Sequence, residues 1–263
     1  MAITTLDGYI ASAKQTITWT KSGTRTTVAG YWFSLFELAG NPGAGVLAGT
    51  STTTGVVPTD ATAGCPVINP FGGAATGYLS SVDFGNGVAC RLGLHDLLWK
   101  GGAYAFNAAT TAQTPTSYAS RIPSGIYTGL QVWIEQVTTG TGVQSVNIAY
   151  NNQDGVAKTT GVTVAPAAGT VGRMWQMPLA SGDTGIQGIT GVTGSVASAG
   201  TFNVLITRPL WTGRCRIAND GDVHSIDKTG LPIVYTDSAL MVLCNADSTS
   251  SGFPELQIEI ANG

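Results

Sequence analysis

The sequence predicts a mainly β fold, a jelly-roll-like β-sandwich with long irregular arms and one short N-terminal helix. Charged residues make up only 10% of the 263-residue chain, and 36 glycines with many Thr, Ser, Ala and Val take their place. An ordinary soluble domain carries about 25% charged residues. Segments rich in β-branched and aromatic residues recur at even spacing between turn signals. No long helical pattern separates them, which favours a sandwich over β-α-β units.

Residues 5–14 are the one segment with helical character. Thr5 can cap a helix, Asp7 would lie in its first turn, and apolar residues recur at helical spacing, although Gly8 weakens the pattern. From residue 16 onward the pattern is that of strands, first over 16–20 and then over 25–38, which are rich in β-branched and aromatic residues. We therefore expect residues 1–38 to form this helix and the first strands.

Residues 39–77 form a long stretch of Gly, Pro, Thr and Ala with almost no charge. A structureless loop of this length in a compact domain usually has a function or holds a partner. We expect an extended arm laid over a protein surface; the alternative is an ordinary linker with a short edge strand near 55–57. The candidate partner-binding residues in this segment are Asn41, Pro42, Val56, Val57, Cys65 and Pro66.

Residues 78–263 are expected to form the body of the sandwich, either as a separate unit or as one domain with the preceding segments. The predicted strands cover 78–84, 88–99, 130–137, 143–150, 156–164, 171–178, 185–193, 196–209, 233–244 and 254–260. Apolar and polar residues alternate clearly over 130–137, as expected for a half-buried strand. The predicted core contains Trp32, Phe33, Val132, Ile134, Val204 and Ile206.

Residues 210–232 are predicted to be a second irregular region. Trp211 is the best candidate for an exposed aromatic contact, and Arg214 and Arg216 join it as candidate partner-binding residues. Asp220, Asp222 and His224 are the candidates for a hard cation such as Ca²⁺. The EF-hand pattern fails, however, and Asn-Asp-Gly-Asp is typical of an ordinary tight turn, so no metal is predicted.

No catalytic constellation is found in the sequence, and no cofactor is predicted. His95 and Asp96 are adjacent, but neighbouring strand residues point to opposite faces, which disfavours an acid–base pair. A glycosidase needs two facing carboxylates, and nothing pairs the four Glu residues with a second acid. Glycine-rich phosphate loops joining a strand to a helix are also absent. We expect a protein that is not an enzyme.

The four cysteines include no CxxC pair, which disfavours a zinc site. Cys90 and Cys244 lie in apolar alternating segments and are expected to be buried. Cys65 and Cys215 lie in loop-like sequence, so these two are the candidates for cross-links in an oxidising compartment.

The charge distribution disfavours nucleic acid and anionic membranes as partners. The net charge is −3 and the cations are scattered, whereas nucleic-acid binding needs concentrated Lys and Arg. The first residues lack the cationic start and apolar stretch of a signal peptide, and no apolar run is long enough to span a membrane. We expect synthesis and assembly in a cytoplasm.

Two stretches carry a resemblance: the opening MAITTLDGYIASAKQ, and the final third from RPLWTGRCRIANDGDVHSIDKTGLPIVYTDSALMVL to NADSTSSGFPELQIEIANG. They resemble the ends of virion structural proteins of tailed bacteriophages. The middle is similar more loosely, through its Gly/Thr texture and VGRMWQMPLASGDTGIQ. The resemblance implies a location in the virion.

Together with the low charge and the arm, this resemblance implies a capsid decoration, or cement, protein that binds the major capsid protein. We expect a homo-oligomer, and the local threefold positions of icosahedral shells suggest a trimer. One alternative is a tail or fibre component that binds host-surface glycan through an exposed aromatic groove. The other is a fibre-associated glycosidase with a carboxylate pair in a cleft.

Overall fold

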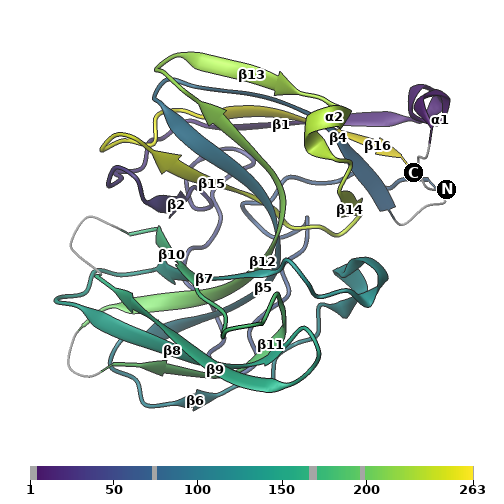
Figure 1. Cartoon of the computed structure of the whole chain (residues 1–263). Coiled ribbons are helices and arrows are strands. Elements are labelled where there is room, and N and C mark those ends of the chain that lie inside the picture. The colour runs from purple at the N-terminus through teal and green to yellow at the C-terminus, as the bar shows by residue number, and fades with distance from the viewer. Residues whose placement is uncertain (1–4, 73–75, 166–170, 196–198, 263) are drawn as a thin grey trace.

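The computed structural model describes residues 5–72, 76–165, 171–195 and 199–262, and it confirms the mainly β fold. Three β-layers lie side by side, and two long strands of the middle layer, β5 (Cys90–Ala105) and β12 (Thr201–Cys215), run from one outer layer toward the other (Figure 1). The middle layer is a closed six-stranded barrel in the order β10-β2-β15-β5-β12-β7. Its other strands are β2 (Trp32–Ser34), β7 (Gln131–Gln136), β10 (Arg173–Met177) and β15 (Leu240–Ala246).

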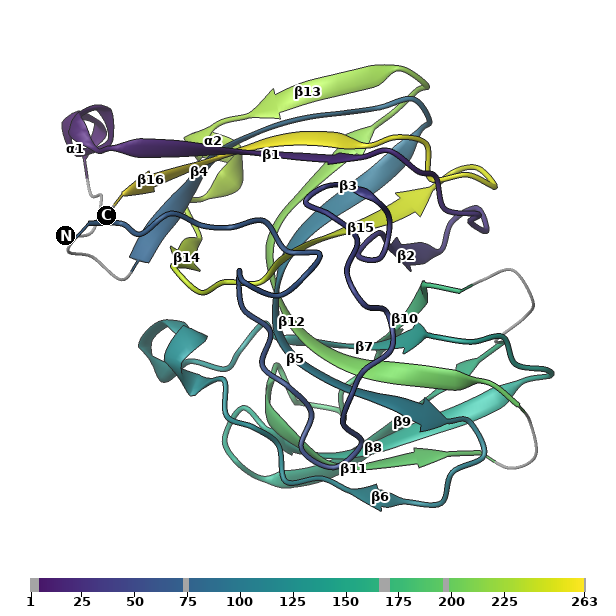
Figure 2. The same cartoon turned by 180° about the vertical axis from the view of Figure 1, so that it is seen from behind.

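A sheet flanks the barrel on each side (Figure 2). The first has the order β13-β4-β16-β1-β3, with β14 also pairing with β4. Its strands are β1 (Lys14–Lys21), β3 (Gly40–Asn41), β4 (Thr76–Asn86), β13 (Asp220–His224), β14 (Ile233–Tyr235) and β16 (Glu255–Asn262). The second has the order β6-β11-β8-β9, formed by β6 (Thr111–Ala112), β8 (Gln144–Asn152), β9 (Ala157–Val164) and β11 (Ile186–Gly194).

The long strands β5 and β12 join the layers because they pair along nearly their whole length and bend together. Register shifts occur between Phe202 and Val204, between Ile206 and Thr207, and between Pro209 and Trp211. Such bulges increase local twist and curve a strand, and they also admit a proline that cannot donate to the ladder. One half of the β5–β12 pair therefore faces the first flanking sheet, and the other half faces the second.

Three clusters of buried side chains hold the layers together. One lies between the first sheet and the barrel, the second between the barrel and the other sheet, and the third is supplied mainly by barrel strands. On β7, Val132 and Ile134 belong to the second cluster, whereas Trp133 points the other way into the third. This is the period-two alternation of a barrel strand. Of the predicted core residues, all are buried except Trp32, which is half-buried.

The short N-terminal helix is confirmed as α1 (Leu6–Ala11), whose N-cap Thr5 accepts a hydrogen bond from Gly8 N at 3.1 Å through its hydroxyl. A second single-turn helix, α2 (Ile226–Thr229), follows β13, and two short 3-10 turns, η1 (Ala119–Arg121) and η2 (Pro123–Gly125), follow β6. Within the described part of the chain, no helix is long and apolar enough to cross a membrane.

The arm, in its described residues 39–72 and 76–77, lies over the protein's own body. Leu47, Ile68 and Phe71 are buried against it. Val56 and Lys100 exchange two backbone hydrogen bonds of 2.9 Å, so the edge pairing expected near 55–57 is a single bridge to β5. Gly55 is required next to this bridge, because its φ is +62° and a Cβ would collide with the indole of Trp99. The arm is therefore part of the fold.

Two other expectations are corrected. Residues 210–232 are not irregular, because β12 continues to Cys215 and is followed by β13 and α2. Residues 25–38 contain only the short strand β2, although their composition suggested a longer one. Segments 1–38, 39–77 and 78–263 share sheets, since β1 pairs with β16 and β2 pairs with β15.

Candidate functional site

Half of the six arm residues predicted to bind a partner are buried. Pro42, Cys65 and Pro66 are buried, and the carbonyl of Pro42 accepts a hydrogen bond of 2.9 Å from Lys21 Nζ. Val57 is half-buried. Asn41 is exposed and donates through its side chain to Thr18 O. Burial therefore removes three of the six from a contact surface, because the arm packs on its own body.

Val56 is exposed, and it borders an apolar hollow between the arm and β5. The hollow has a volume of about 290 Å³, and Phe36, Val46, Ala48, Val56, Pro58 and Leu97 are among its lining residues. The side chain of Val46 is 63% exposed. Lys100 reaches the same place, but its Nζ donates to Val46 O at 3.0 Å and lies 3.7 Å from Glu135 Oε2. We call the hollow and the exposed side chains of Val46 and Val56 beside it the valine surface. This surface is apolar, because the amino group of Lys100 is engaged with Val46 O and Glu135.

Trp211 is not an exposed loop residue. It lies on β12 and is 5% exposed, packed edge-on against Phe84 with ring centroids 4.8 Å apart. Its Nε1 donates to His224 Nδ1 at 2.9 Å. Arg214 and Arg216 are exposed, and together with Arg91 they line an open depression beside β13. The sequence missed the burial of Trp211 because β12 extends further than its local pattern indicates.

The three candidate cation ligands are engaged with other groups. Asp220 Oδ2 accepts a hydrogen bond from Arg216 N at 2.7 Å, and Asp222 accepts one from Lys228 Nζ at 3.2 Å. Hydrogen bonds from the Val223 backbone and from Lys228 lower the pKa of Asp222. Among the residues that the structure describes, no group of three His, Cys, Asp or Glu side chains is arranged to hold a metal ion.

All four cysteines are free and buried. Cys215 is the direct cross-strand neighbour of Cys90, and Cys244 belongs to the same buried cluster. Cys65 lies in a different cluster with Phe36 and Leu97. Burial raises the pKa of the Cys65 thiol to about 12, which holds it in its unreactive protonated form. A cross-link between Cys65 and Cys215 is therefore not available in this fold.

His95 and Asp96 point to opposite faces of β5, as predicted. Asp96 is fully buried and accepts hydrogen bonds from Arg121, Arg208, Ser238 and the Ala239 backbone. His95 Nδ1 lies 3.1 Å from Thr207 Oγ1, on the other face. Burial lowers the pKa of His95 to about 4, so its ring is neutral at pH 7.

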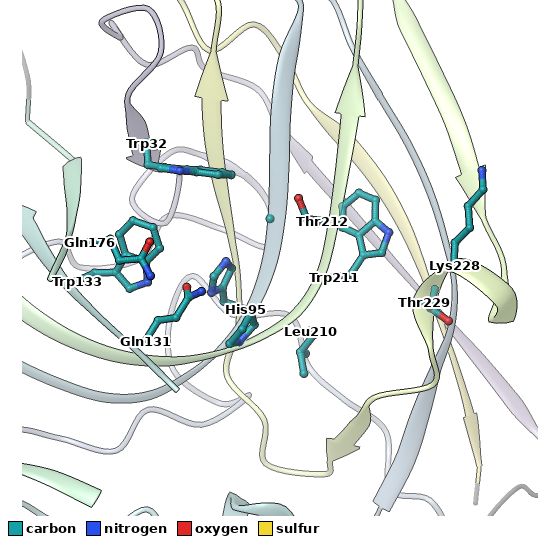
Figure 3. Close-up of a pocket in the computed structure, with 12 residues that line it drawn as sticks. Trp32, His95, Gln131, Trp133, Gln176, Leu210, Trp211, Thr212, Lys228 and Thr229 are labelled. Carbon is teal, nitrogen blue, oxygen red and sulfur yellow. The ribbon is translucent and has the colours of Figure 1, made fainter. Parts of the chain in front are cut away.

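A second cavity, here called the aromatic pocket, opens beside five strands of the barrel and helix α2. Its volume is about 430 Å³. Its lining residues come from β2, β5, β7, β10, β12 and α2: Trp32, Gly93, His95, Gln131, Trp133, Gln176, Pro209, Leu210, Trp211, Thr212, Lys228 and Thr229. Figure 3 shows the side chains of Trp32, His95, Gln131, Trp133 and Gln176 gathered at one end, with Lys228 and Thr229 at the other. Of these residues, only His95, Trp32 and Trp211 stand out in the sequence, and each for another reason.

The rings of the pocket are set edge to face. Trp32 and Trp133 have ring centroids 6.3 Å apart at 73°, and His95 and Trp133 have centroids 6.2 Å apart at 81°. T-shaped contacts of this kind are a preferred and stabilising arrangement of aromatic rings. The wall of the pocket is therefore built of aromatic rings that pack against one another.

No protein-family model and no curated protein matches this chain. Two solved structures are similar at a very low level. A mutant VP2 protein of infectious bursal disease virus, from T=1 particles, is 10% identical over 95% of this chain and 77% of that chain, with a TM-score of 0.14. A chain of the infectious bursal disease virus Gx strain is 13% identical over 95% and 40%, with a TM-score of 0.13. Both TM-scores are too low to support a conclusion about fold or function.

Proposed function

We propose that this protein is a structural component of a tailed-bacteriophage virion, a capsid decoration protein that binds the major capsid protein through the valine surface. The observation that supports the proposal is an arm with almost no charge, packed on the β body, that leaves the apolar side chains of Val46 and Val56 exposed around a hollow. Exposed apolar surface of this kind is typical of protein-binding sites.

The low charge of the chain supports the same proposal. Charged groups lose hydration when they enter an interface, and this costs free energy unless they are paired. With only 10% charged residues, the molecule presents little such penalty to a partner. The resemblance of the two ends of the sequence to phage virion proteins supports a partner within the virion. Self-association as a trimer on the capsid is part of the proposal.

The test compares two pairs of substitutions on opposite parts of the molecule. Val46→Asp with Val56→Asp places charge on the valine surface. Val143→Asp with Val156→Asp places the same charge at the ends of β8 and β9, where Val143 is 70% exposed against 63% for Val46. Each variant is co-sedimented with capsids purified without the decoration protein.

The first variant should lose at least about tenfold in capsid affinity, because a desolvated unpaired carboxylate opposes burial. The control should bind like the wild type. Equal binding by both variants would refute the valine surface as the contact. Absence of the wild-type protein from purified virions would refute the virion assignment itself. Analytical ultracentrifugation of the free protein, and its copy number in the virion, test the trimer.

A further inference from the structure

The aromatic pocket contains buried polar atoms with no partner. Trp133 Nε1 and Gln131 Oε1 are both buried, and neither forms a hydrogen bond within the described part of the chain. The side chain of Trp133 is 3% exposed. An unpaired buried donor or acceptor is costly, so native proteins normally satisfy such atoms with water or a ligand. One donor and one acceptor are thus left free two residues apart on β7, where alternate residues share a face, and both residues line the pocket.

Gly93 leaves the imidazole of His95 open toward the same space. A Cβ at residue 93 would lie 2.9 Å from His95 Nε2 and 3.7 Å from Trp32 Cζ3. The other ring nitrogen, Nδ1, is already beside Thr207. The missing side chain therefore gives Nε2 access to the pocket and leaves the Trp32 ring uncovered.

The pocket is almost free of charge. Lys228 is the one residue among those lining it that carries a full charge at pH 7, and it lies at the far end in Figure 3. No carboxylate is among the lining residues, so the general acid and the nucleophile or base of a glycosidase are not supplied there. Amide, indole and neutral imidazole groups instead offer donors and acceptors suited to hydroxyl groups. A ligand with an apolar face and several hydroxyl groups matches both the aromatic rings and the uncharged polar groups that line the pocket.

We propose that the aromatic pocket binds a neutral pyranose residue of a glycan, with the C–H face of the sugar against Trp32 and its hydroxyls paired with Trp133 Nε1, Gln131 and His95 Nε2. The volume of about 430 Å³ lies within the range of small-ligand pockets, about 300–1,000 Å³. Burial lowers the pKa of His95, which keeps the ring neutral toward a neutral ligand. This site is separate from the valine surface and does not depend on the capsid proposal.

The test uses the full chain and a panel of methyl glycosides of glucose, galactose, mannose and N-acetylglucosamine, with sialic acid as the anionic comparison. Binding is measured by titration calorimetry and by tryptophan fluorescence. Trp32→Ala removes the stacking surface, Gln131→Leu removes the amide at nearly constant volume, and Gly93→Ala covers His95 Nε2. The matched control is Trp175→Ala, because Trp175 is also half-buried but does not line the pocket.

At least one neutral glycoside should bind, and each pocket variant should weaken it by about tenfold or more, as expected for loss of stacking or of a buried hydrogen bond. Trp175→Ala should keep the wild-type affinity. The proposal is overturned if no neutral glycoside binds at about 10 mM, well above a millimolar Kd, if only the anionic sugar binds, or if Gln131→Leu and Gly93→Ala bind normally. Capsid binding should be unchanged in Gln131→Leu, so failure of this proposal is distinguishable from failure of the decoration role.

Discussion

Replacing Asp96 with alanine tests whether one buried ionic network holds the centre of the molecule together. The carboxylate is 0% exposed and accepts from Arg121 Nη1 at 3.2 Å and Arg208 Nη2 at 3.1 Å. It also accepts from Ser238 Oγ at 2.9 Å and Ala239 N at 3.0 Å. Through these bonds β5 is tied to β12, to η1 and to the turn before β15.

The magnitude follows from the burial of Arg121. Its side chain is 0% exposed, and its remaining contacts are to the backbone carbonyls of Leu97, Leu98 and Asp237. Without Asp96 this guanidinium would be a buried charge with no counter-ion. Removing one partner of a buried ion pair costs about 3–5 kcal/mol. With a urea m-value of about 3 kcal/mol/M, the unfolding midpoint should fall by about 1–2 M.

The assay is urea unfolding followed by tryptophan fluorescence, with Asp247→Ala as the matched control. Asp247 also faces an arginine, but the Arg214–Asp247 distance is 4.0 Å and both side chains are 54% exposed. An exposed pair of this kind contributes about 0–1 kcal/mol, so the control midpoint should barely move. If Asp96→Ala unfolds at the same urea concentration as Asp247→Ala, the network does not stabilise the fold and this reasoning is wrong.

Three further predictions concern the arm, a histidine and the thiols. Leu47→Ala and Phe71→Ala should each lower the free energy of unfolding by about 2–5 kcal/mol, because both side chains are buried. Deletion of 41–75 should unfold the body, whereas an arm that only binds a partner could be removed without unfolding it. Thermal unfolding measures both effects. The pKa of His95 is about 4 when folded and about 6.5 when unfolded, so the unfolded state binds more protons between these values. Stability should be full above pH 6.5 and fall by about 3 kcal/mol toward pH 4, and His95→Gln should flatten this slope in urea titrations at each pH. The four buried cysteines should react with Ellman's reagent only after unfolding, and a fast-reacting thiol in the native protein would contradict their burial.

The sequence by itself determined the fold class and much of the core. Strand alternation has a period of two, so residues 130–137 reveal the strand, and Val132 and Ile134 are buried as predicted. The opposite face of the strand, with Trp133 and Glu135, is buried as well, which the alternation of a half-buried strand did not indicate. The cap at Thr5 and the opposite faces of His95 and Asp96 also follow from local geometry. These features depend only on residues close in the chain.

Only the tertiary structure decided where the arm lies and what Trp211 contacts. Both depend on β5, which bridges to Val56 of the arm and pairs with β12 from about a hundred residues further along the chain. No local pattern encodes such a pairing, because every strand offers the same backbone donors and acceptors, and the choice of a distant partner depends on packing across the whole fold. The aromatic pocket has the same origin, since Trp32, His95, Gln131 and Gln176 meet only when the barrel closes.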